Sequence, residues 1–300
     1  MACGGGPVRP WRRAPAAEPA AVPPTHLLLR CAACGTAVTA GPPPAPDAHA
    51  AGAYRPGPPR GSRLAAPLLR RFDARRLALL RARPPGRLLD VGAGRGRFVA
   101  GARAAGWDAR GIEPSPRSAA PHVEAATIES ARVAPGSLDA ITLWHVLEHL
   151  DDPAGALARL RGWLAPDGVL LVGVPDLGSL QAALGGPRWY HLDLPRHRTH
   201  FTAPGIHALL ARTGFEVLGV EHRLLEHNPF GMWQSLVNRL TPTPSWLYNV
   251  LKRNARVRAA DLAPTLALLP AAPLAAALEA VAARRGRGGT LAILARASGQ

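Results

Sequence analysis

Lysine is almost absent from this chain of 300 residues: Lys252 is the single lysine among 36 basic side chains, and the formal charge is +16. A strongly basic chain ordinarily indicates a nucleic acid or an anionic surface as its partner. Here arginine replaces lysine throughout, and alanine, proline and glycine are also abundant. This composition is typical of a GC-rich genome, so the charge by itself says little about the partner.

Cysteine is also scarce, and three cysteines exclude a disulfide framework. The sequence has no early apolar run that ends in a small-residue cleavage site, as a secretory signal requires. Both absences favour the cytoplasm. The length allows one large domain with appendages.

A glycine-rich turn at Leu88–Phe98 joins an apolar strand to an expected helix. Glycine has no Cβ and tolerates positive φ, so the backbone of such a turn comes close to a ligand. The helix that follows offers free N–H groups and the positive end of its dipole. Taken alone, this turn indicates a nucleotide-type site and plain helix packing equally well. Glu113 stands about 20 residues on, where a ribose-binding acid is expected, although a solvated acid is the alternative.

Four segments follow one another in order: Leu88–Phe98, Glu113, Leu138–Leu150 and Leu164–Val172. Together they resemble the class I S-adenosylmethionine-dependent methyltransferases. The Glu148-His149-Leu150 sequence and the Leu-x-Pro-x-Gly turn are characteristic of the subgroup that methylates small molecules. The resemblance covers residues Arg83 to Val217 and a last strand at Thr290–Ala295. It implies S-adenosylmethionine as the cofactor.

By this resemblance, the cofactor lies against the glycine-rich turn, the acid after the second strand, the loop beside the adenine ring and the end of the fourth strand. The residues expected there are Asp90, Gly92, Ala93, Gly94, Gly96, Glu113, Thr127, Ile128, Trp144 and His145. For Thr127 and Ile128 a plain connecting loop is equally open. Glu148 and His149 are expected to cap the next helix.

Alternating strands and helices predict a parallel sheet with right-handed crossovers. The fold expected from the resemblance is α/β, a Rossmann-like doubly wound sheet of seven strands with an antiparallel last strand. The predicted strands are Arg87–Val91, Asp108–Ile112, Leu138–Leu143, Gly168–Val174, Phe215–Glu221 and Thr290–Ala295. The predicted helices are Leu64–Arg83 as one or two, Arg97–Ala105, Pro116–Glu124, Pro153–Trp163 and Pro204–Thr213.

Four parts are expected along the chain. Residues 1–60 form an extension rich in proline, alanine and glycine, most of which is predicted to be loop. Residues 61–223 form the methyltransferase core with a helical cap, and residues 290–300 add its last strand and tail. Residues 224–289 are a helical insertion, in which Leu262–Leu278 is uncharged but interrupted by proline and short for a bilayer span. Packed helices and an interfacial hairpin are both open.

A C-x-x-C-G sequence at Cys31 and Cys34 resembles a zinc knuckle, in which two thiolates from one turn occupy two corners of a tetrahedron. Related methyltransferases begin with a four-cysteine ribbon, and Cys3-Gly4-Gly5 is similar to the end of its first knuckle, whose other cysteine would precede Met1. His26 is a candidate fourth ligand. Such a zinc would be structural; three reduced cysteines without metal are the alternative.

Histidines in the segment after the fifth strand are the candidates for proton transfer. The segment Asp193–Thr202 resembles the P-x-H-x-x-H-F-(S/T) sequence of the subgroup. Histidine suits a general base because its pKa lies near neutrality. His197 and His200 are therefore the candidates, with His191 behind them; the alternative is that they brace the loop through backbone hydrogen bonds.

The sequence favours methyl transfer to a small-molecule or lipid-like acceptor, on oxygen before carbon or nitrogen. A nucleic-acid methyltransferase is the first alternative, but no Asn-Pro-Pro-Tyr or Asp-Pro-Pro-Tyr tetrapeptide and no Pro-Cys nucleophile is present. A non-catalytic cofactor-binding protein is the second. Arginines beside the apolar insertion make contact with an anionic membrane surface a further hypothesis. The sequence does not indicate an oligomeric state.

Overall fold

The computed structural model describes residues 2–17, 23–43, 62–81, 83–114, 120–224, 226–252 and 254–298. The chain divides into two compact units. The extension unit comprises Met1–Arg60, Pro175–Ile206 and Glu221–Leu291, and the sheet unit comprises Gly61–Val174, His207–Val220 and Ala292–Gln300. The extension and the insertion, which were expected as separate parts, thus belong to one unit.

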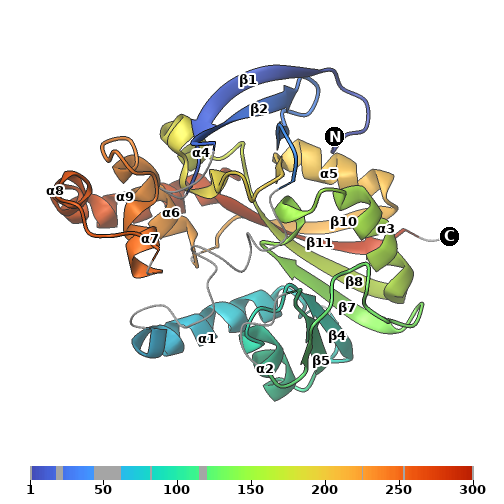
Figure 1. Cartoon of the computed structure of the whole chain (residues 1–300). Coiled ribbons are helices and arrows are strands. Elements are labelled where there is room, and N and C mark those ends of the chain that lie inside the picture. Colours follow the sequence, from blue (N-terminus) through green and yellow to red (C-terminus); the bar gives the residue numbers. More distant parts are fainter. Residues whose placement is uncertain are drawn as a thin grey trace. The chain divides into compact units, whose positions relative to one another are not determined.

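The sheet unit is built on a mixed seven-stranded sheet in the order β10-β11-β8-β7-β4-β5-β6 within the described residues (Figure 1). Strands β4 to β8 pair in parallel, and the last strands are antiparallel. The predicted Rossmann-like fold is confirmed. The strands are β4 (Arg87–Val91), β5 (Asp108–Ile112), β6 (Val123–Glu124), β7 (Leu138–Trp144), β8 (Leu164–Pro175), β10 (Phe215–Glu221) and β11 (Thr290–Ala297).

The helices of this part of the chain are α1 (Ser62–Ala78), α2 (Arg97–Ala104), α3 (Pro153–Trp163) and α5 (Ala203–Arg212). Helix α3 begins as its sequence predicts, because Asp152 accepts a hydrogen bond from the Gly155 N–H and proline follows it. Strand β8 starts four residues earlier than predicted, since Leu164 pairs with Leu138.

One predicted helix, Pro116–Glu124, is wrong at its end. Residues 115–119 lie outside the described part of the chain, and Val123 and Glu124 form strand β6 beside β5. A strand of two residues carries no periodicity, so the pairing with Gly111 and Ile112 decides its conformation.

The extension unit contains a second sheet in the order β1-β2-β3-β9. Its strands are β1 (Val8–Pro15), β2 (Thr25–Cys31), β3 (Ala37–Thr39) and β9 (Thr199–His200). The prediction of loop was therefore wrong for these parts of residues 1–60. The strands β1, β2 and β3 pair with one another in antiparallel fashion, so a composition rich in proline, alanine and glycine did not reveal them, and Ala37 and Val38 pair in addition with the distant His200 and Thr199.

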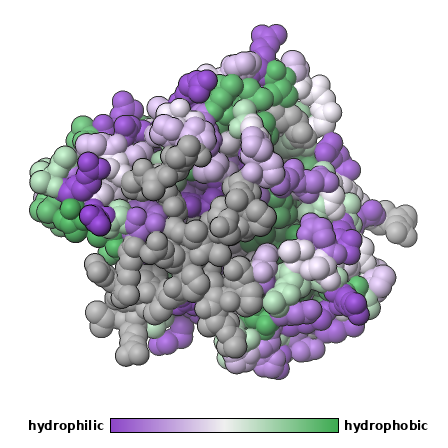
Figure 2. Space-filling model, in the orientation of Figure 1, coloured by the Kyte–Doolittle hydropathy of each residue, from purple (hydrophilic) through white to green (hydrophobic). Residues whose placement is uncertain are grey.

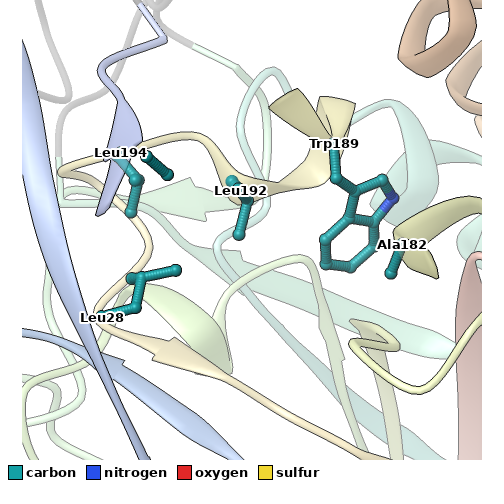
Figure 3. Close-up of a cluster of buried hydrophobic side chains, with 6 residues drawn as sticks. Leu28, Ala182, Trp189, Leu192 and Leu194 are labelled. Carbon is teal, nitrogen blue, oxygen red and sulfur yellow. The ribbon is translucent and has the colours of Figure 1, made fainter. Parts of the chain in front are cut away.

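Helices α4 (Leu180–Gly185), α6 (Asn228–Val237), α7 (Trp246–Leu251), α8 (Ala259–Ala267) and α9 (Ala272–Arg284) complete the extension unit. Met232, Trp233 and Val237 of α6 pack against Ala275 of α9. A second cluster joins the sheet to a helix: Leu28, Leu192 and Leu194 face one another, and the Trp189 ring lies beside Ala182 (Figure 3). The insertion is thus a set of packed helices.

Among the described residues, no single helix has the length and apolar character needed to cross a membrane. Ala259–Ala267 and Leu269–Arg284 meet the requirement only as a pair, which is bent by 41°.

Candidate active site

The glycine-rich turn connects β4 to α2. Gly92, Gly94 and Gly96 have φ values of +73°, +56° and +69°, a region that side chains with a Cβ rarely adopt. A Cβ on Gly92 would lie 2.3 Å from Val146, and one on Gly96 would lie 2.9 Å from Val123. Beyond its chain neighbours, a Cβ on Gly94 would meet no atom of the described residues within 4 Å. The outer glycines are thus required for packing, and Gly94 borders open space.

Glu113 lies against this turn, as the sequence predicts. The Gly94 N–H donates a hydrogen bond to Glu113 Oε2 at 2.9 Å. The contact follows from the sheet register, because Val91 pairs with Ile112 and the chain leaves both parallel strands at the same edge. The N–H groups of Gly92 and Ala93 also donate to the Ile112 carbonyl. The acid and the turn therefore form one site.

Asp90 is buried below the turn and holds two strands together. Thr142 Oγ1 on β7 donates to Asp90 Oδ1 at 2.6 Å. Burial raises the pKa of Asp90 to about 7, although the bond from Thr142 favours the ionised form. Asp90 is therefore a buried acid that titrates near neutrality.

Trp144 ends β7, which pairs in parallel with β4, so it lies at the same edge of the sheet as the turn. Its ring covers Gly173, where a Cβ would lie 2.7 Å from the indole, and the Arg76 guanidinium lies 4.3 Å from the ring centroid. The Trp144 Nε1 atom is buried and has no hydrogen-bond partner among the described residues. Buried donors are normally paired, so this one is an exception within the described part of the chain.

His145 follows Trp144 with φ +56°, in the left-handed region that residues other than glycine rarely adopt. Its Nδ1 lies 3.0 Å from Glu148 Oε1, and Glu148 is buried in the 3-10 turn Leu147–His149. Sequence reasoning assigned Glu148 to a helix cap and did not connect it to His145. The three-residue spacing between them, read across a turn rather than a helix, was the available indication.

Thr127 and Ile128 form an ordered connection. The Thr127 N–H donates to Ser130 Oγ, and the Ser130 N–H donates to Thr127 Oγ1. Ile128 is buried. A capped turn of this kind is compatible with a plain connecting loop and with a loop beside the adenine ring. The role of Thr127 and Ile128 beside the adenine ring therefore stays a prediction.

The residues of this region belong to a segment of the chain that matches a known protein family. A family profile described as a methyltransferase domain matches residues 62–220. The chain belongs to the methyltransferase-domain family. The match spans more than half of the chain and includes Gly94, Glu113 and Trp144, so the predicted class I S-adenosylmethionine-dependent methyltransferase family is confirmed, whereas the Glu-His-Leu subgroup stays a prediction.

Solved structures are similar to this methyltransferase in fold. A chain of the complex between the Haloferax volcanii Trm112 methyltransferase activator and a methyltransferase is 14% identical, with a TM-score of 0.50, over 80% of this chain and 95% of that one. A methyltransferase from Thermotoga maritima is 20% identical over 77% and 92%, with a TM-score of 0.47. The 1,6-didemethyltoxoflavin-N1-methyltransferase of Burkholderia thailandensis is 15% identical over 97% and 99%, with a TM-score of 0.45. No curated protein matches the chain.

In the extension unit of this methyltransferase, His197 is buried and fixed through one ring nitrogen. His197 Nδ1 lies 2.9 Å from the His191 carbonyl oxygen. A carbonyl only accepts, so Nδ1 carries the proton and Nε2 of the neutral ring carries the lone pair. Nε2 lies 3.8 Å from Asp193 Oδ2. The predicted candidate therefore has the tautomer that a proton acceptor at Nε2 needs.

His200 has a different environment. Thr39 Oγ1 donates to the His197 carbonyl at 2.7 Å, so the hydroxyl accepts from His200 Nε2, which lies 3.0 Å away. Burial lowers the pKa of His200 to about 3, and Arg198 lowers it further. These contacts favour a structural role for His200 in joining β9 to β3.

A small hollow with enclosed space for about one water molecule opens in the extension unit beside Asp193. Asp193 and Ser245 both line it, and both have positive φ, at 39° and 52°. Such strained residues are frequent at binding sites. The other lining residues are Pro15, Ala17, Pro187, Arg188, Trp189, Tyr190, Leu192 and Pro244.

The three cysteines converge, as the zinc hypothesis requires. Cys3 Sγ lies 3.4 Å from Cys31 Sγ, and the sulfur atoms of Cys3, Cys31 and Cys34 all lie within 4.8 Å of one another. A hydrogen bond from the Gly5 backbone, followed by one from Cys31, lowers the pKa of Cys3 to about 6.

His26 does not join the cysteines, and its assignment as a fourth ligand was wrong. It is the second residue of strand β2, where it pairs with Ala14, whereas Cys31 ends the strand opposite Val8. Five residues of extended chain separate the two by about 16 Å.

Proposed function

We propose that this protein transfers a methyl group from S-adenosylmethionine to an oxygen atom of a small-molecule or lipid-like acceptor. The observation that carries the proposal is the convergence of Gly94 and Glu113 at the carboxyl end of the sheet, where an added Cβ on Gly94 would meet no atom of the described residues within 4 Å beyond its chain neighbours. When bound, S-adenosylmethionine supplies an electrophilic methyl group on a sulfonium centre. The family match to a methyltransferase domain supports the same cofactor.

The residues present fit this cofactor. Gly94 lets the backbone approach a ligand, and its N–H orients the carboxylate of Glu113, which is suited to accept hydrogen bonds from vicinal ribose hydroxyls. Trp144 ends the neighbouring strand β7 at the same edge of the sheet. Asp90, Gly92, Ala93, Gly96 and His145 shape the turn and the strand end around it.

His197 is proposed as the group that takes up the proton of an acceptor hydroxyl. Its Nδ1–H is held by the His191 carbonyl, and its Nε2 is the proton-accepting atom. The nearby carboxylate of Asp193 would stabilise the imidazolium that forms. His200 is assigned the structural role described above, because its Nε2 proton is donated to Thr39.

The hollow beside Asp193 is proposed as a contact surface for part of the acceptor. Its enclosed space is about that of one water molecule, so a group of the acceptor would lie against it rather than inside it. Trp189 and Tyr190 offer aromatic surface to such a group, and Ser245 offers a hydroxyl.

A structural zinc ion is proposed at Cys3, Cys31 and Cys34. Thiolates around a tetrahedral zinc ion lie about 3.8 Å apart, given Zn–S bonds of about 2.3 Å. The observed sulfur separations bracket that value. Such an ion would hold the start of β1 against the end of β2. Metal analysis of untagged protein tests it: near-stoichiometric zinc that is lost in Cys31→Ser supports the site, and zinc-free wild-type protein contradicts it.

Transfer of a tritiated methyl group from S-adenosylmethionine into cell extract tests the function. We expect label in the small-molecule or lipid fraction, and base-stable ether or base-labile ester products identify oxygen as the acceptor atom. Label in a nuclease-sensitive fraction would favour a nucleic-acid methyltransferase. Tight cofactor binding with no label in any fraction would favour a non-catalytic cofactor-binding protein.

A further inference from the structure

Helices α8 and α9 and the 3-10 turn Leu269–Ala271 between them have an inside-out arrangement of polarity. In this fully described stretch, every exposed residue from Ala259 to Val281 is apolar. Its two charged residues, Asp261 and Glu279, are both buried. A surface helix of a globular protein shows the opposite arrangement, with its polar face toward water.

The buried acids fix the orientation of the two helices. Asp261 accepts hydrogen bonds from the N–H and the hydroxyl of Thr243, at 2.9 and 3.1 Å. Glu279 accepts from the Gly289 N–H at 2.7 Å and from Gln181 Nε2 at 3.0 Å. Rotating either helix to bury its apolar face would leave these carboxylates without partners, which is costly. The apolar face is therefore held outward.

The outward face carries five large side chains, which we name the apolar ridge: Leu266, Leu269, Leu274, Leu278 and Val281. Their exposed fractions are 55, 54, 63, 38 and 43%. Figure 2 shows hydrophobic residues gathered at the edge where Figure 1 places α8 and α9. Contiguous exposed apolar surface of this kind marks an interaction site.

The ridge has arginines at both ends. Arg256 and Arg258 precede it, Arg284, Arg285 and Arg287 follow it, and all five are exposed. No exposed acid lies between residues 254 and 288. An apolar face with a basic border matches the interfacial layer of an anionic membrane, where apolar side chains enter the acyl boundary and arginines meet headgroups.

We propose that the apolar ridge inserts into the interface of membranes that contain anionic lipid and so anchors the protein peripherally. The bend of 41° and the two buried acids fit a segment that lies in the interface rather than one that spans the bilayer. A second copy is the less favourable occupant, because an isologous contact through the ridge would bring the arginine borders of both copies together. The proposal is independent of the methyl acceptor.

Flotation with lipid vesicles tests this anchor. We expect the full-length protein to float with vesicles of phosphatidylcholine and phosphatidylglycerol, and to be released as salt rises because the Debye length shortens. The variant L266Q/L274Q/L278Q should lose at least about tenfold in vesicle affinity, since three leucines no longer enter the acyl boundary. The double variant with Arg284→Gln and Arg285→Gln should weaken binding to vesicles that contain anionic lipid, and it should leave binding to neutral vesicles unchanged.

The matched control is L218Q/V220Q, which changes two exposed apolar residues of β10 that lie outside the ridge. It should float like the wild type. Binding of S-adenosylhomocysteine by every variant shows that each is folded and separates this test from the test of the cofactor site. Wild-type protein that stays unbound at low salt overturns the proposal, as does an L266Q/L274Q/L278Q variant that floats normally. A wild-type dimer that this variant dissociates, without vesicle binding, identifies a second copy as the occupant instead.

Discussion

Asp90 in the sheet unit and His200 in the extension unit are both buried beside a threonine hydroxyl. Burial shifts the pKa values of these two groups in opposite directions. The pKa of Asp90 is raised to about 7, and the pKa of His200 is lowered to about 3. In each case burial disfavours the charged form. The sheet unit should thus lose stability toward alkaline pH and the extension unit toward acid pH.

Replacing Asp90 by asparagine gives the largest expected effect. The native state binds the Asp90 proton more tightly than the unfolded chain does, so this group's contribution is full below pH 4 and is lost as pH rises through 7. A shift from 3.8 to about 7 corresponds to about 4 kcal/mol above pH 7. We expect Asp90→Asn, which keeps an acceptor for Thr142, to unfold at higher urea than wild type at pH 8 and to lose this advantage near pH 4.

Asp139→Asn is the control for that measurement, because Asp139 lies at the surface with Arg87 and is much more exposed than Asp90. Its difference from wild type should be small and should not grow between pH 5 and 8. If Asp90→Asn shows no pH-dependent gain over wild type, the buried-acid half of the comparison is wrong.

The next largest effect is expected in the extension unit. The neutral form of His200 is favoured in the fold, so its contribution is full above pH 6.5 and is lost as pH falls toward 3. At pH 5 this loss amounts to about 2 kcal/mol. His200→Gln should therefore flatten the acid side of the stability curve, as followed by pulsed hydrogen exchange of peptides from β3 and β9. Equal acid sensitivity of the variant and wild type would contradict the assignment.

How well the sequence predicted each region depends on where its contacts come from. The turn at Gly92, Gly94 and Gly96 lies between a local strand and a local helix, so residues 87–104 contain the information needed. The strand β3 pairs with β2 on one side and, on the other, with Thr199 and His200, which lie more than a hundred residues away. Composition favoured loop there, and the tertiary pairing overrode it.

The candidate site shows the same division. Gly94 and Glu113 were found together because consecutive parallel strands end at one edge of a sheet. The His145 and Glu148 pair was missed because it depends on a left-handed residue that is not glycine. The tautomers of His197 and His200 also depend on distant partners, so the sequence presented them as equivalent.

Truncating Glu113 has a smaller expected effect, and it is confined to the sheet unit. Glu113→Ala removes an acceptor for the cofactor hydroxyls and should weaken S-adenosylhomocysteine binding by about 1–3 kcal/mol, the cost of losing a hydrogen bond to a charged group. Glu113→Gln should recover part of that loss. Unchanged affinity in the alanine variant would remove Glu113 from the site, and calorimetric titration makes the comparison.

The smallest expected change in cofactor affinity is that of a variant in the extension unit. His197→Gln should leave cofactor affinity unchanged within about twofold, since its proposed role is proton transfer. Once an acceptor is known, the kcat of the His197→Gln variant should fall and the acid limb of the pH–rate profile of this variant should disappear. The His200→Gln variant should retain that limb. A profile that is unchanged in His197→Gln would assign proton transfer elsewhere.

Calorimetric titration of S-adenosylhomocysteine into wild type, Gly94→Val and Gly162→Ala tests the cofactor site most directly. At both glycines an added Cβ would meet none of the described atoms within 4 Å outside the local backbone, but Gly162 lies within helix α3, far from the turn in the sequence. We predict one bound molecule per chain in wild type and Gly162→Ala, and a loss of at least about 100-fold in Gly94→Val, because a branched side chain occupies the ligand's space. Equal binding in all three proteins, or none in wild type, would contradict the account.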